Sequence, residues 1–477
     1  MTDLMLVNPL FLHEDPVEQR LMTPYFPLGL LYLAATARDA GYTVSIFDAM
    51  FQAGDDAFVA ALERERPKVV GLGVLATVRA AALRLADLAH QHGAAVVAGG
   101  ADPTGRPESY LRYRSNGSHP VGVVVIGEGE QTLLELLPWL LNDERNGGLL
   151  REIAGLAFLD DDGKFVSTAA RKHCADLDSL ALPARDLIDL EAYRQAWRKR
   201  HGIFSLSLIA TRGCPYGCTW CQKSVFGRSF RPRSPESVAE EMRLIKEQYR
   251  PDQLRVVDDV MGIDRQWVRA WHAAVLERDA VVPFECLSRV DLMDEEMVRL
   301  LQEAGCIRIA FGAESGSQKV LDAMNKGTTV EQIRRTAELC RRSGIETYFY
   351  IMVGYPGEEW ADIRKTVELL KQTRPDQFSS TIAYPLPGTE FYEEVKHRLL
   401  DMPDWDYTAE NRLLFQRDHS TRFYRWVQRW LHQEWHMARL RHGQERVSPI
   451  GWARRLGGVW TSRALVHLLR FLPGDSE

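Results

Sequence analysis

Residues 211–221 read Thr-Arg-Gly-Cys-Pro-Tyr-Gly-Cys-Thr-Trp-Cys, and this stretch indicates both the fold and the chemistry of the chain. Its cysteines, Cys214, Cys218 and Cys221, follow the spacing C-x3-C-x2-C. Three thiolates at this spacing suit three corners of a cubane iron–sulfur cluster and leave the fourth iron without a protein ligand. An electron-transfer cluster closes that corner with a fourth cysteine, and none lies nearby. The spacing therefore predicts a cluster that binds a small molecule at its open iron.

A structural zinc site is the main alternative, and three buried, unreactive cysteines are another. Zinc knuckles present one Cys pair and a second Cys or His pair further along the chain. No second pair follows Cys221 closely. Trp220, just before the last cysteine, and Arg212-Gly213, just before the first, also argue against zinc. We therefore favour the cluster.

Length and composition predict a multidomain protein of the cytoplasm. The chain has 477 residues, 45% of them hydrophobic and 26% charged, which is ordinary for about two to four globular domains. The net charge of −6 argues against broad nucleic-acid binding. The other cysteines are isolated and fit a reducing compartment: Cys174, Cys286, Cys306 and Cys340. Neither a signal peptide nor a membrane-spanning segment is evident.

Residues 1–145 are expected to form a Rossmann-like, doubly wound parallel sheet. Short apolar segments at 4–7, 44–48, 69–74, 95–100 and 123–126 alternate with helix-forming segments. In such sheets the ligand binds outside the carboxyl ends of the strands, where glycine-rich turns let the backbone approach it closely. The candidate ligand-binding residues there are Asn8, Leu28, Thr77, Gly99, Gly100, Thr104, Gly127 and Glu128.

Residues 146–200 are expected to be a linker that contains a hairpin with an Asp162-Gly163 turn. Residues 201–395 again alternate between apolar and amphipathic segments. Six candidate strands lie at 206–210, 254–258, 284–288, 307–311, 347–352 and 378–384. Six βα units predict a partial barrel, whose active groups belong at the carboxyl ends of the strands. The cysteines directly follow the first of these strands.

The cysteine stretch resembles the signature of the radical S-adenosylmethionine (SAM) superfamily. Other segments resemble its cobalamin-binding branch, which includes anaerobic magnesium-protoporphyrin monomethyl ester cyclase, hopanoid C-methylases and phosphinate P-methylases. These segments are residues 27–30, 99–104, 127–130, 311–317, 324–327 and 385–389. The resemblance covers residues 1–395. It implies a 4Fe-4S cluster on Cys214, Cys218 and Cys221, SAM on the open iron, and cobalamin in the first domain.

The resemblance also directs attention to groups at successive strand ends of the barrel. The residues expected to bind SAM are Trp220, Asp258, Ser288, Arg289, Glu314 and Tyr355. Arg289 is expected to pair with the SAM carboxylate, and Glu314 to accept from the ribose hydroxyls or the amino group. Each of these residues taken alone could equally be a surface charge or part of a turn. Because the Asp-x-His-x-x-Gly motif is absent, cobalamin is expected to bind without a lower histidine ligand.

The resemblance implies that a reduced cluster cleaves SAM to a 5′-deoxyadenosyl radical, which abstracts hydrogen from an unactivated carbon of a small-molecule substrate. Methylcobalamin then methylates that carbon of a natural-product or cofactor precursor. The alternatives are oxidative cyclisation or rearrangement without methyl transfer, and a cobalamin carrier with an inert cluster. A tRNA methylthiotransferase would need a second group of three cysteines, and the other four cysteines of this chain are isolated. A flavodoxin- or ferredoxin-type protein is expected to supply electrons, and no residue is assigned to catalysis.

Residues 396–477 are expected to be helical and to contact the substrate. Phe423, Trp426, Val427, Trp430 and Leu431 fall on one helical face. The arginines around that face are Arg422, Arg425, Arg429, Arg439 and Arg441. Three interpretations stay open: a helix packed over the barrel mouth, a lid on a large, flat or acidic substrate, or a contact with an anionic membrane surface.

Overall fold

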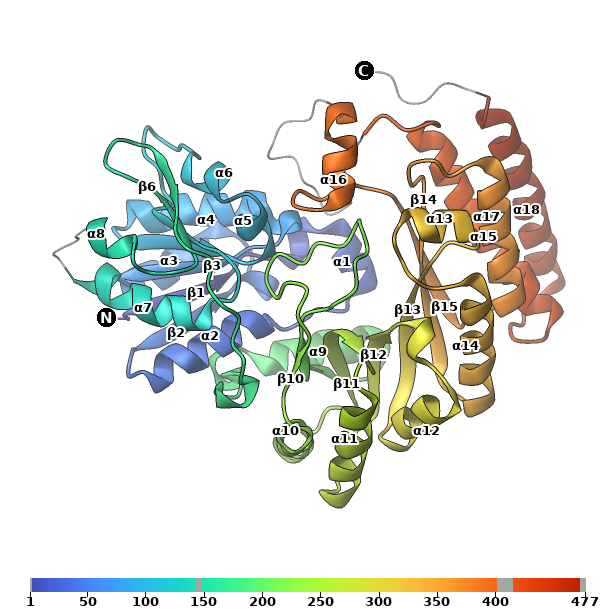
Figure 1. The fold of residues 1–477 in the computed structure, drawn as a ribbon, viewed down its shortest axis with the longest axis horizontal. Helices are drawn as coiled ribbons and strands as arrows, with labels where there is room; N and C mark the ends of the chain where they lie inside the picture. The colour runs from blue at the N-terminus through green and yellow to red at the C-terminus, as the bar shows by residue number, and fades with distance from the viewer. Residues whose placement is uncertain (1, 143–146, 401–414, 472–477) are drawn as a thin grey trace.

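The computed structural model describes residues 2–142, 147–400 and 415–471. Two β-sheets flanked by helices lie side by side, and two long helices complete the carboxyl-terminal end (Figure 1). This arrangement confirms the expected α/β class with a helical carboxyl-terminal segment. The expected boundary at residue 145, and residues 401–414 and 472–477 of the last segment, lie outside the described residues.

The first sheet has the strand order β2-β1-β3-β4-β5-β6-β7. Its parallel strands are β1 (Leu4–Asn8), β2 (Val44–Asp48), β3 (Val69–Gly73), β4 (Ala95–Gly99) and β5 (Val123–Val125). Every residue of β1 and β5 is buried, as expected for strands covered on both faces. One face packs on α2 (Leu28–Asp39) and α7 (Glu130–Leu141), and the other on α3 (Asp55–Glu65) and α4 (Arg79–Gln91).

The segment expected to be a linker extends the first sheet. Its hairpin, β6 (Leu156–Leu159) and β7 (Phe165–Ser167), pairs antiparallel with β5 and extends the sheet. The helix α9 (Leu190–His201) then packs on the first domain, because Tyr193 donates to Asp48 at 2.7 Å and Trp197 donates to the Pro24 carbonyl at 2.9 Å. The linker is therefore a packed part of the structure.

The second sheet is parallel throughout, with the order β15-β14-β13-β12-β11-β8. Its strands are β8 (Ser205–Leu208), β11 (Gln253–Met261), β12 (Phe284–Ser288), β13 (Cys306–Glu314), β14 (Glu346–Val353) and β15 (Gln377–Ile382). The helices between them are α10 (Pro235–Gln248), α11 (Arg265–Glu277), α12 (Glu295–Glu303), α14 (Val330–Ser343) and α15 (Trp360–Thr373). β8 and β15 remain at opposite edges, so the sheet is an open, partial barrel, as predicted.

Short elements complete the chain. The short helices are α1 (Pro16–Leu21), α5 (Ala101–Gly105), α6 (Pro107–Leu111), α8 (Gly147–Leu150), α13 (Gln318–Ala323) and α16 (Glu390–Val395). A small hairpin, β9 (Thr211–Arg212) paired with β10 (Arg231–Pro232), frames the cysteine loop. The 3-10 turns lie at 12–14, 49–51, 76–78, 177–179, 185–187, 290–292 and 396–398.

The carboxyl-terminal helices α17 (Thr421–Arg441) and α18 (Pro449–Leu469) continue the outer ring of barrel helices. The ring of Phe378 on β15 stacks on His432 of α17, with centroids 4.3 Å apart, and meets Trp435 edge-on. α17 therefore covers the outside of the last strand and does not lie across the barrel mouth. Its first turn still reaches the loop after β14, where Tyr424 packs against Gly354. Among the described helices, none combines the length and apolar character that a membrane crossing needs.

Candidate active site

The start of the cysteine loop is fixed by a buried carboxylate. Asp258, on β11 and 1% exposed, accepts hydrogen bonds from the backbone nitrogens of Ala210 and Thr211 at 2.7 and 3.1 Å. It also accepts from the Thr211 hydroxyl at 2.9 Å. Burial raises the pKa of Asp258 to about 6. Asp258 was expected to bind SAM, and in this structure its carboxylate holds the backbone at the start of the loop.

Gly213 allows the chain to turn from β9 (Thr211–Arg212) into the cysteine loop. Its φ is 86°, in the left-handed region, and a Cβ there would overlap the Ser229 carbonyl oxygen. Gly213→Ala is therefore expected to displace the loop and to cut the iron bound per chain after anaerobic reconstitution to less than half. Gly357→Ala, with a similar φ of 76° and open space around its Cβ, is the matched control and should keep its iron. Equal iron in both variants would show that the turn does not depend on Gly213.

The three cysteines lie in the cysteine loop, where the two domains meet. Cys218 is buried at 8% exposure, and Cys214 and Cys221 are half-buried. Burial raises the pKa of the Cys214 thiol, and that of Cys221 to about 11, so binding metal must release protons from the thiols. In the described residues, no three His, Cys, Asp or Glu side chains converge on one metal ion. A cubane binds each cysteine to a different iron, so a loop that supplies three thiols suits the three protein-bound corners of such a cluster.

Arg289, at the end of β12, packs directly on the cysteine loop. Its guanidinium lies 3.6 Å from the centre of the Tyr216 ring and 4.0 Å from the Cys218 sulfur. The same group donates to Asp291 at 3.0 and 3.2 Å and to the Lys326 carbonyl at 2.8 Å. The guanidinium expected to meet the SAM carboxylate is therefore beside the cysteines, already held by Asp291.

A buried ion pair occupies the end of β13. Lys326 donates to Glu314 at 3.0 Å, and the two residues are 7% and 2% exposed. Burial alone lowers the pKa of Lys326, but the charges of Glu314 and Cys218 raise it above its usual value. A side chain at Gly312 would overlap this pair, and Glu314 holds a left-handed φ of 57°. The backbone is therefore strained where Glu314 meets Lys326.

The other residues expected to bind SAM surround the same loop. Ser288 donates to the Met261 carbonyl at 2.6 Å, which uses its hydroxyl inside the barrel. Tyr355 shares a hydrogen bond of 2.7 Å with Thr219 of the loop. The indole of Trp220 lies 5.7 Å from the Lys326 nitrogen. Within the described structure its buried Nε1 has no hydrogen-bond partner, so this donor is available to a ligand.

A cavity of about 320 Å³ lies at the carboxyl ends of β1, β3, β4 and β5. Of the residues expected to bind a ligand, it brings together Asn8, Leu28, Gly99, Gly100, Gly127 and Glu128. Thr104 accepts from the Gly127 nitrogen at 3.1 Å and so shapes the rim, whereas Thr77 is not among the lining residues. Tyr25, Phe26 and Phe226 also line the cavity and were missed, because nothing in their local sequence distinguishes them from core aromatics.

Charged side chains at this cavity join the two domains. Arg212 pairs with Glu130 at 2.6 Å and with Glu128 at 3.4 Å, and Arg231 pairs with Glu128 at 2.8 Å. Burial raises the pKa of Glu128, but its bonds to Arg231 and Cys174 lower it below the usual value. Glu128 was expected to contact the ligand of the first domain. The structure gives its carboxylate a second role as an interdomain anchor.

The far end of the cysteine loop rests on the first domain. Ser224 donates to the Ala101 carbonyl at 3.1 Å, and Val225 and Phe226 line the cavity. The loop therefore lies between the cavity of the first sheet and the open edge of the second, at the centre of Figure 1. The molecule therefore belongs to a class of two-domain proteins. A Rossmann-like sheet lies on one side of a loop with three cysteines, and a partial barrel lies on the other.

Comparisons with known proteins agree with this geometry. The family model described as Radical SAM superfamily matches residues 208–370, and that of the B12 binding domain matches residues 20–137. The chain is 27% identical to an uncharacterized methyltransferase of Pyrococcus horikoshii over 397 residues, which are 82% of this chain and 83% of the relative. It is 28% identical over 392 residues to the anaerobic magnesium-protoporphyrin IX monomethyl ester cyclase of Rubrivivax gelatinosus, covering 80% of this chain and 69% of that one.

A solved structure has the same fold. TsrM from Kitasatospora setae, a radical S-adenosylmethionine methyltransferase with cobalamin and a 4Fe-4S cluster bound, superposes with a TM-score of 0.67 at 22% identity. The superposition covers 83% of this chain and 75% of that chain. This chain therefore belongs to the radical SAM superfamily and carries a B12-binding domain ahead of its radical SAM domain. It is an enzyme whose cofactors are SAM, a 4Fe-4S cluster and cobalamin, as expected from the sequence.

Proposed function

We propose that this enzyme uses the radical derived from SAM to methylate an unactivated carbon of a small-molecule precursor, with cobalamin as the methyl donor. The observation that carries the proposal is the position of the cysteine loop. Arg289 and Lys326 contact the loop from the barrel side, and Ser224 and Phe226 contact the first domain at its far end. The cysteine loop thus lies between the barrel, where we place SAM, and the first domain, where we place cobalamin. The names of the Pyrococcus horikoshii relative and of TsrM, both methyltransferases, support the same reaction class.

We assign the cluster to Cys214, Cys218 and Cys221. The cluster supplies one electron to SAM, and cobalamin supplies the methyl group. Arg289 places a cation 4.0 Å from the Cys218 sulfur, and Lys326 places another 5.7 Å from the Trp220 ring of the same loop, where both would offset the negative charge of thiolate ligands. Asp258 and Gly213 hold the start of the loop in place.

We assign the SAM site to the ends of β12, β13 and β14. Trp220 offers a free N–H, and the Glu314 carboxylate and the Tyr355 hydroxyl lie in the same shell around the loop. Arg289 would need to exchange its bond to Asp291 for one to the SAM carboxylate. Asp258 and Ser288 stay in the proposed SAM-binding set, and their side chains here bond to Thr211 and to the Met261 carbonyl.

We assign cobalamin to residues 1–145 and the barrel chemistry to residues 201–395. Within residues 396–477, we assign substrate contacts to the part near the loop after β14, which the first turn of α17 reaches through Tyr424. The cavity of about 320 Å³ would hold only part of a cofactor as large as cobalamin. The glycines at its rim would let the rest of the cofactor lie close to the backbone outside the cavity. Among the described residues that line it there is no histidine. We propose that cobalamin binds without a lower histidine ligand.

The experiment that tests the proposal follows the products of SAM under anaerobic conditions. The reconstituted, reduced enzyme is given cobalamin and candidate precursors, and SAM products are separated by chromatography. Methyl transfer is expected to yield 5′-deoxyadenosine and S-adenosylhomocysteine together, about one of each per methylated product. Deoxyadenosine with product but without S-adenosylhomocysteine would instead indicate a cyclase or rearrangement enzyme. No consumption of SAM would indicate a cobalamin carrier.

We also propose a reducing, cytoplasmic setting and a flavodoxin- or ferredoxin-type electron donor. All seven cysteines are free, including the four outside the loop, which fits a compartment without disulfide formation. The cluster must receive one electron for each SAM that is cleaved reductively. A reductase-coupled flavodoxin is therefore expected to replace a chemical reductant in the product assay.

A further inference from the structure

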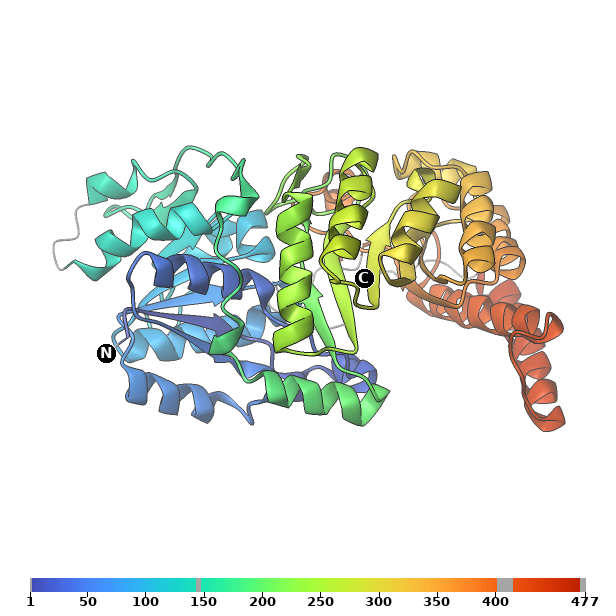
Figure 2. The ribbon, with the colours of Figure 1, turned by 90° about the horizontal axis from the view of Figure 1, so that it is seen from below.

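The carboxyl-terminal helices carry a charge opposite to that of the whole chain. Residues 415–471 contain eleven arginines, no lysine and three carboxylates, a formal charge of +8, whereas the complete sequence carries −6. α17 and α18 lie at the outer edge of the barrel, on the side away from the first domain (Figure 1). In the second view the end of α18 projects beyond the rest of the molecule (Figure 2). The positive charge is therefore concentrated on one protruding end.

The outer face of α18 is apolar and exposed. Ile450, Trp460 and Leu468 are 76%, 65% and 65% exposed, and Phe471, just after the helix, is 71% exposed. These residues fall at helical spacing, and the positions between them on that face are Ala453, Gly457 and Ala464. The opposite face, with Val459, Val466 and Leu469, is buried. A surface helix normally presents polar residues outward, so the outer face of α18 is unusual for one facing only water.

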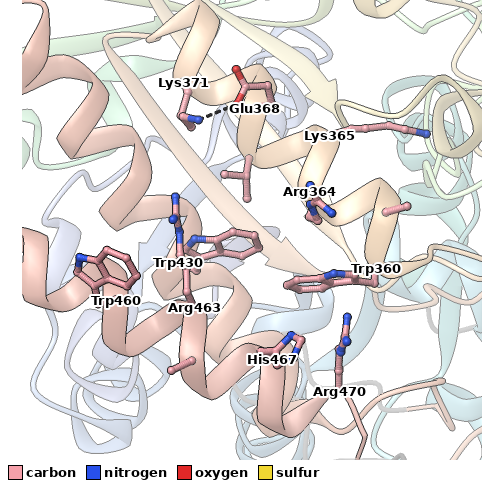
Figure 3. A pocket seen from close by; sticks show the side chains of 13 residues that line it. Trp360, Arg364, Lys365, Glu368, Lys371, Trp430, Trp460, Arg463, His467 and Arg470 are labelled. Atoms are coloured by element: carbon pink, nitrogen blue, oxygen red, sulfur yellow. Dashed lines mark hydrogen bonds and ion pairs between the residues drawn. The ribbon is translucent and has the colours of Figure 1, made fainter.

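A cationic cleft of about 1070 Å³ runs along the same helix, between α18, α15 and α17 (Figure 3). Trp360 and Trp430 stack in it with ring centres 5.4 Å apart, and Arg470 lies 5.4 Å from the Trp360 ring. Lys371 and Arg463 pair with Glu368 and Glu434 at 2.7 and 2.5 Å. Within the described residues, Arg364 and Arg470 have no carboxylate within ion-pair distance. The cleft therefore holds two arginines, Arg364 and Arg470, that no carboxylate of the described residues neutralises.

We propose that α18 and this cleft form a docking surface for an anionic lipid bilayer. The exposed apolar residues of α18, called here the apolar ridge, enter the boundary between headgroups and acyl chains. The arginines beside the ridge bind the lipid phosphates. Trp, Leu and Phe on one helical face with arginines along its edges are the composition of helices that lie in a membrane interface. The bilayer also explains why both kinds of group occur together at the protruding end.

Charge decides between a bilayer and a second copy of this chain as the occupant. Two copies that met through α18 would bring two surfaces of +8 together, and the ridge offers no carboxylate to the arginines of the other copy. An anionic bilayer satisfies the arginines and covers the apolar residues at once. The contact leaves the cysteine loop untouched, because the loop lies on the other side of the barrel sheet (Figure 1).

The test is sedimentation of the cobalamin-loaded full chain with vesicles, which needs no enzymatic activity. We expect binding to vesicles of phosphatidylglycerol and phosphatidylcholine, and at least about tenfold weaker binding to phosphatidylcholine alone. Trp460→Ser/Leu468→Ser is expected to weaken binding to the anionic vesicles about tenfold or more, because two large side chains no longer enter the interface. Arg454→Glu, at an exposed position of α18, is expected to weaken it about tenfold through charge reversal.

The matched control is Leu276→Ser, an exposed leucine at 48% on α11, which should leave vesicle binding unchanged. Circular dichroism and cobalamin content confirm that the variants are folded. The proposal is overturned if the chain binds neither vesicle, or if both α18 variants bind like the parent. It is equally overturned if ultracentrifugation shows a dimer that Trp460→Ser/Leu468→Ser dissociates, because α18 is then a contact between copies.

Discussion

Replacing Cys214 with alanine is expected to reduce 5′-deoxyadenosine formation to background while cobalamin stays bound. Only three thiols tether the cluster, and each holds a different iron, so the loss of one leaves two irons of the cubane without a protein ligand. The cobalamin cavity is formed by the ends of β1, β3, β4 and β5 together with Arg212, Val225 and Phe226, none of which depends on the Cys214 side chain. The measurement is chromatography of SAM products beside the cobalamin absorbance of the purified chain.

Cys174→Ala is the matched control, because this half-buried cysteine lies in the linker outside the loop. It should retain both deoxyadenosine formation and cobalamin. If Cys214→Ala still cleaves SAM at the parent rate, the cysteine is not a ligand. If it loses cobalamin together with the cluster, the proposed division of labour between residues 1–145 and 201–395 is wrong.

Arg212→Met is expected to destabilise the enzyme by about 3–5 kcal/mol and to lower its cobalamin content. Arg212 is 4% exposed and neutralises Glu130 across the two domains. Its removal leaves a buried carboxylate without a counter-charge, since Arg231 pairs with Glu128. It also removes the cation that lies 5.3 Å from the ring of Tyr32 and 5.1 Å from that of Phe226. Urea unfolding and cobalamin absorbance measure the two effects.

Two further variants make this prediction specific. Arg112→Met removes an arginine that pairs with Glu108 at 2.7 Å on the exposed surface, and it should change stability by less than about 1 kcal/mol. Arg212→Met/Glu130→Leu removes the buried charge along with its partner and should recover part of the lost stability. If Arg212→Met unfolds at the same urea concentration as the parent, the ion pair does not hold the domains together.

The strands were predictable from the sequence because short, largely apolar segments alternate with helix-forming segments along the chain. β2 (Val44–Asp48) and β12 (Phe284–Ser288) begin and end as predicted. β13 (Cys306–Glu314) runs longer than its predicted range of 307–311 at both ends, because Cys306, Gly312 and Glu314 also pair with residues of the neighbouring strands. Local pattern therefore found the elements, and pairing set their ends.

The partners of the charged groups were not predictable, because they lie far away in the sequence. Nothing near Glu128 shows that Arg212 and Arg231 will neutralise it. Lys326 lies in a segment that carried the family resemblance, but its pairing with Glu314 depends on how closely that segment approaches the end of β13 at Gly312. Arg289 is an exception: it was expected at the site and is there, and its partner Asp291 lies nearby in the sequence, in the turn after β12.

The carboxyl-terminal helices show the same limit. The apolar face of Phe423, Val427 and Leu431 is buried, as its helical spacing predicts. The sequence does not say which surface that face covers, and the structure places it on the barrel's outer helices and last strand. The exposed ridge of α18 was missed, because a helix that is apolar on both faces gives no periodic signal.

The central claim is that Cys214, Cys218 and Cys221 hold a cluster whose fourth iron binds SAM. The most direct measurement is the EPR spectrum of the anaerobically reconstituted, reduced protein before and after SAM is added. The account predicts a change in the g values of the reduced cluster when SAM binds. An identical spectrum at saturating SAM would contradict it, because it would mean that the ligand does not reach the iron.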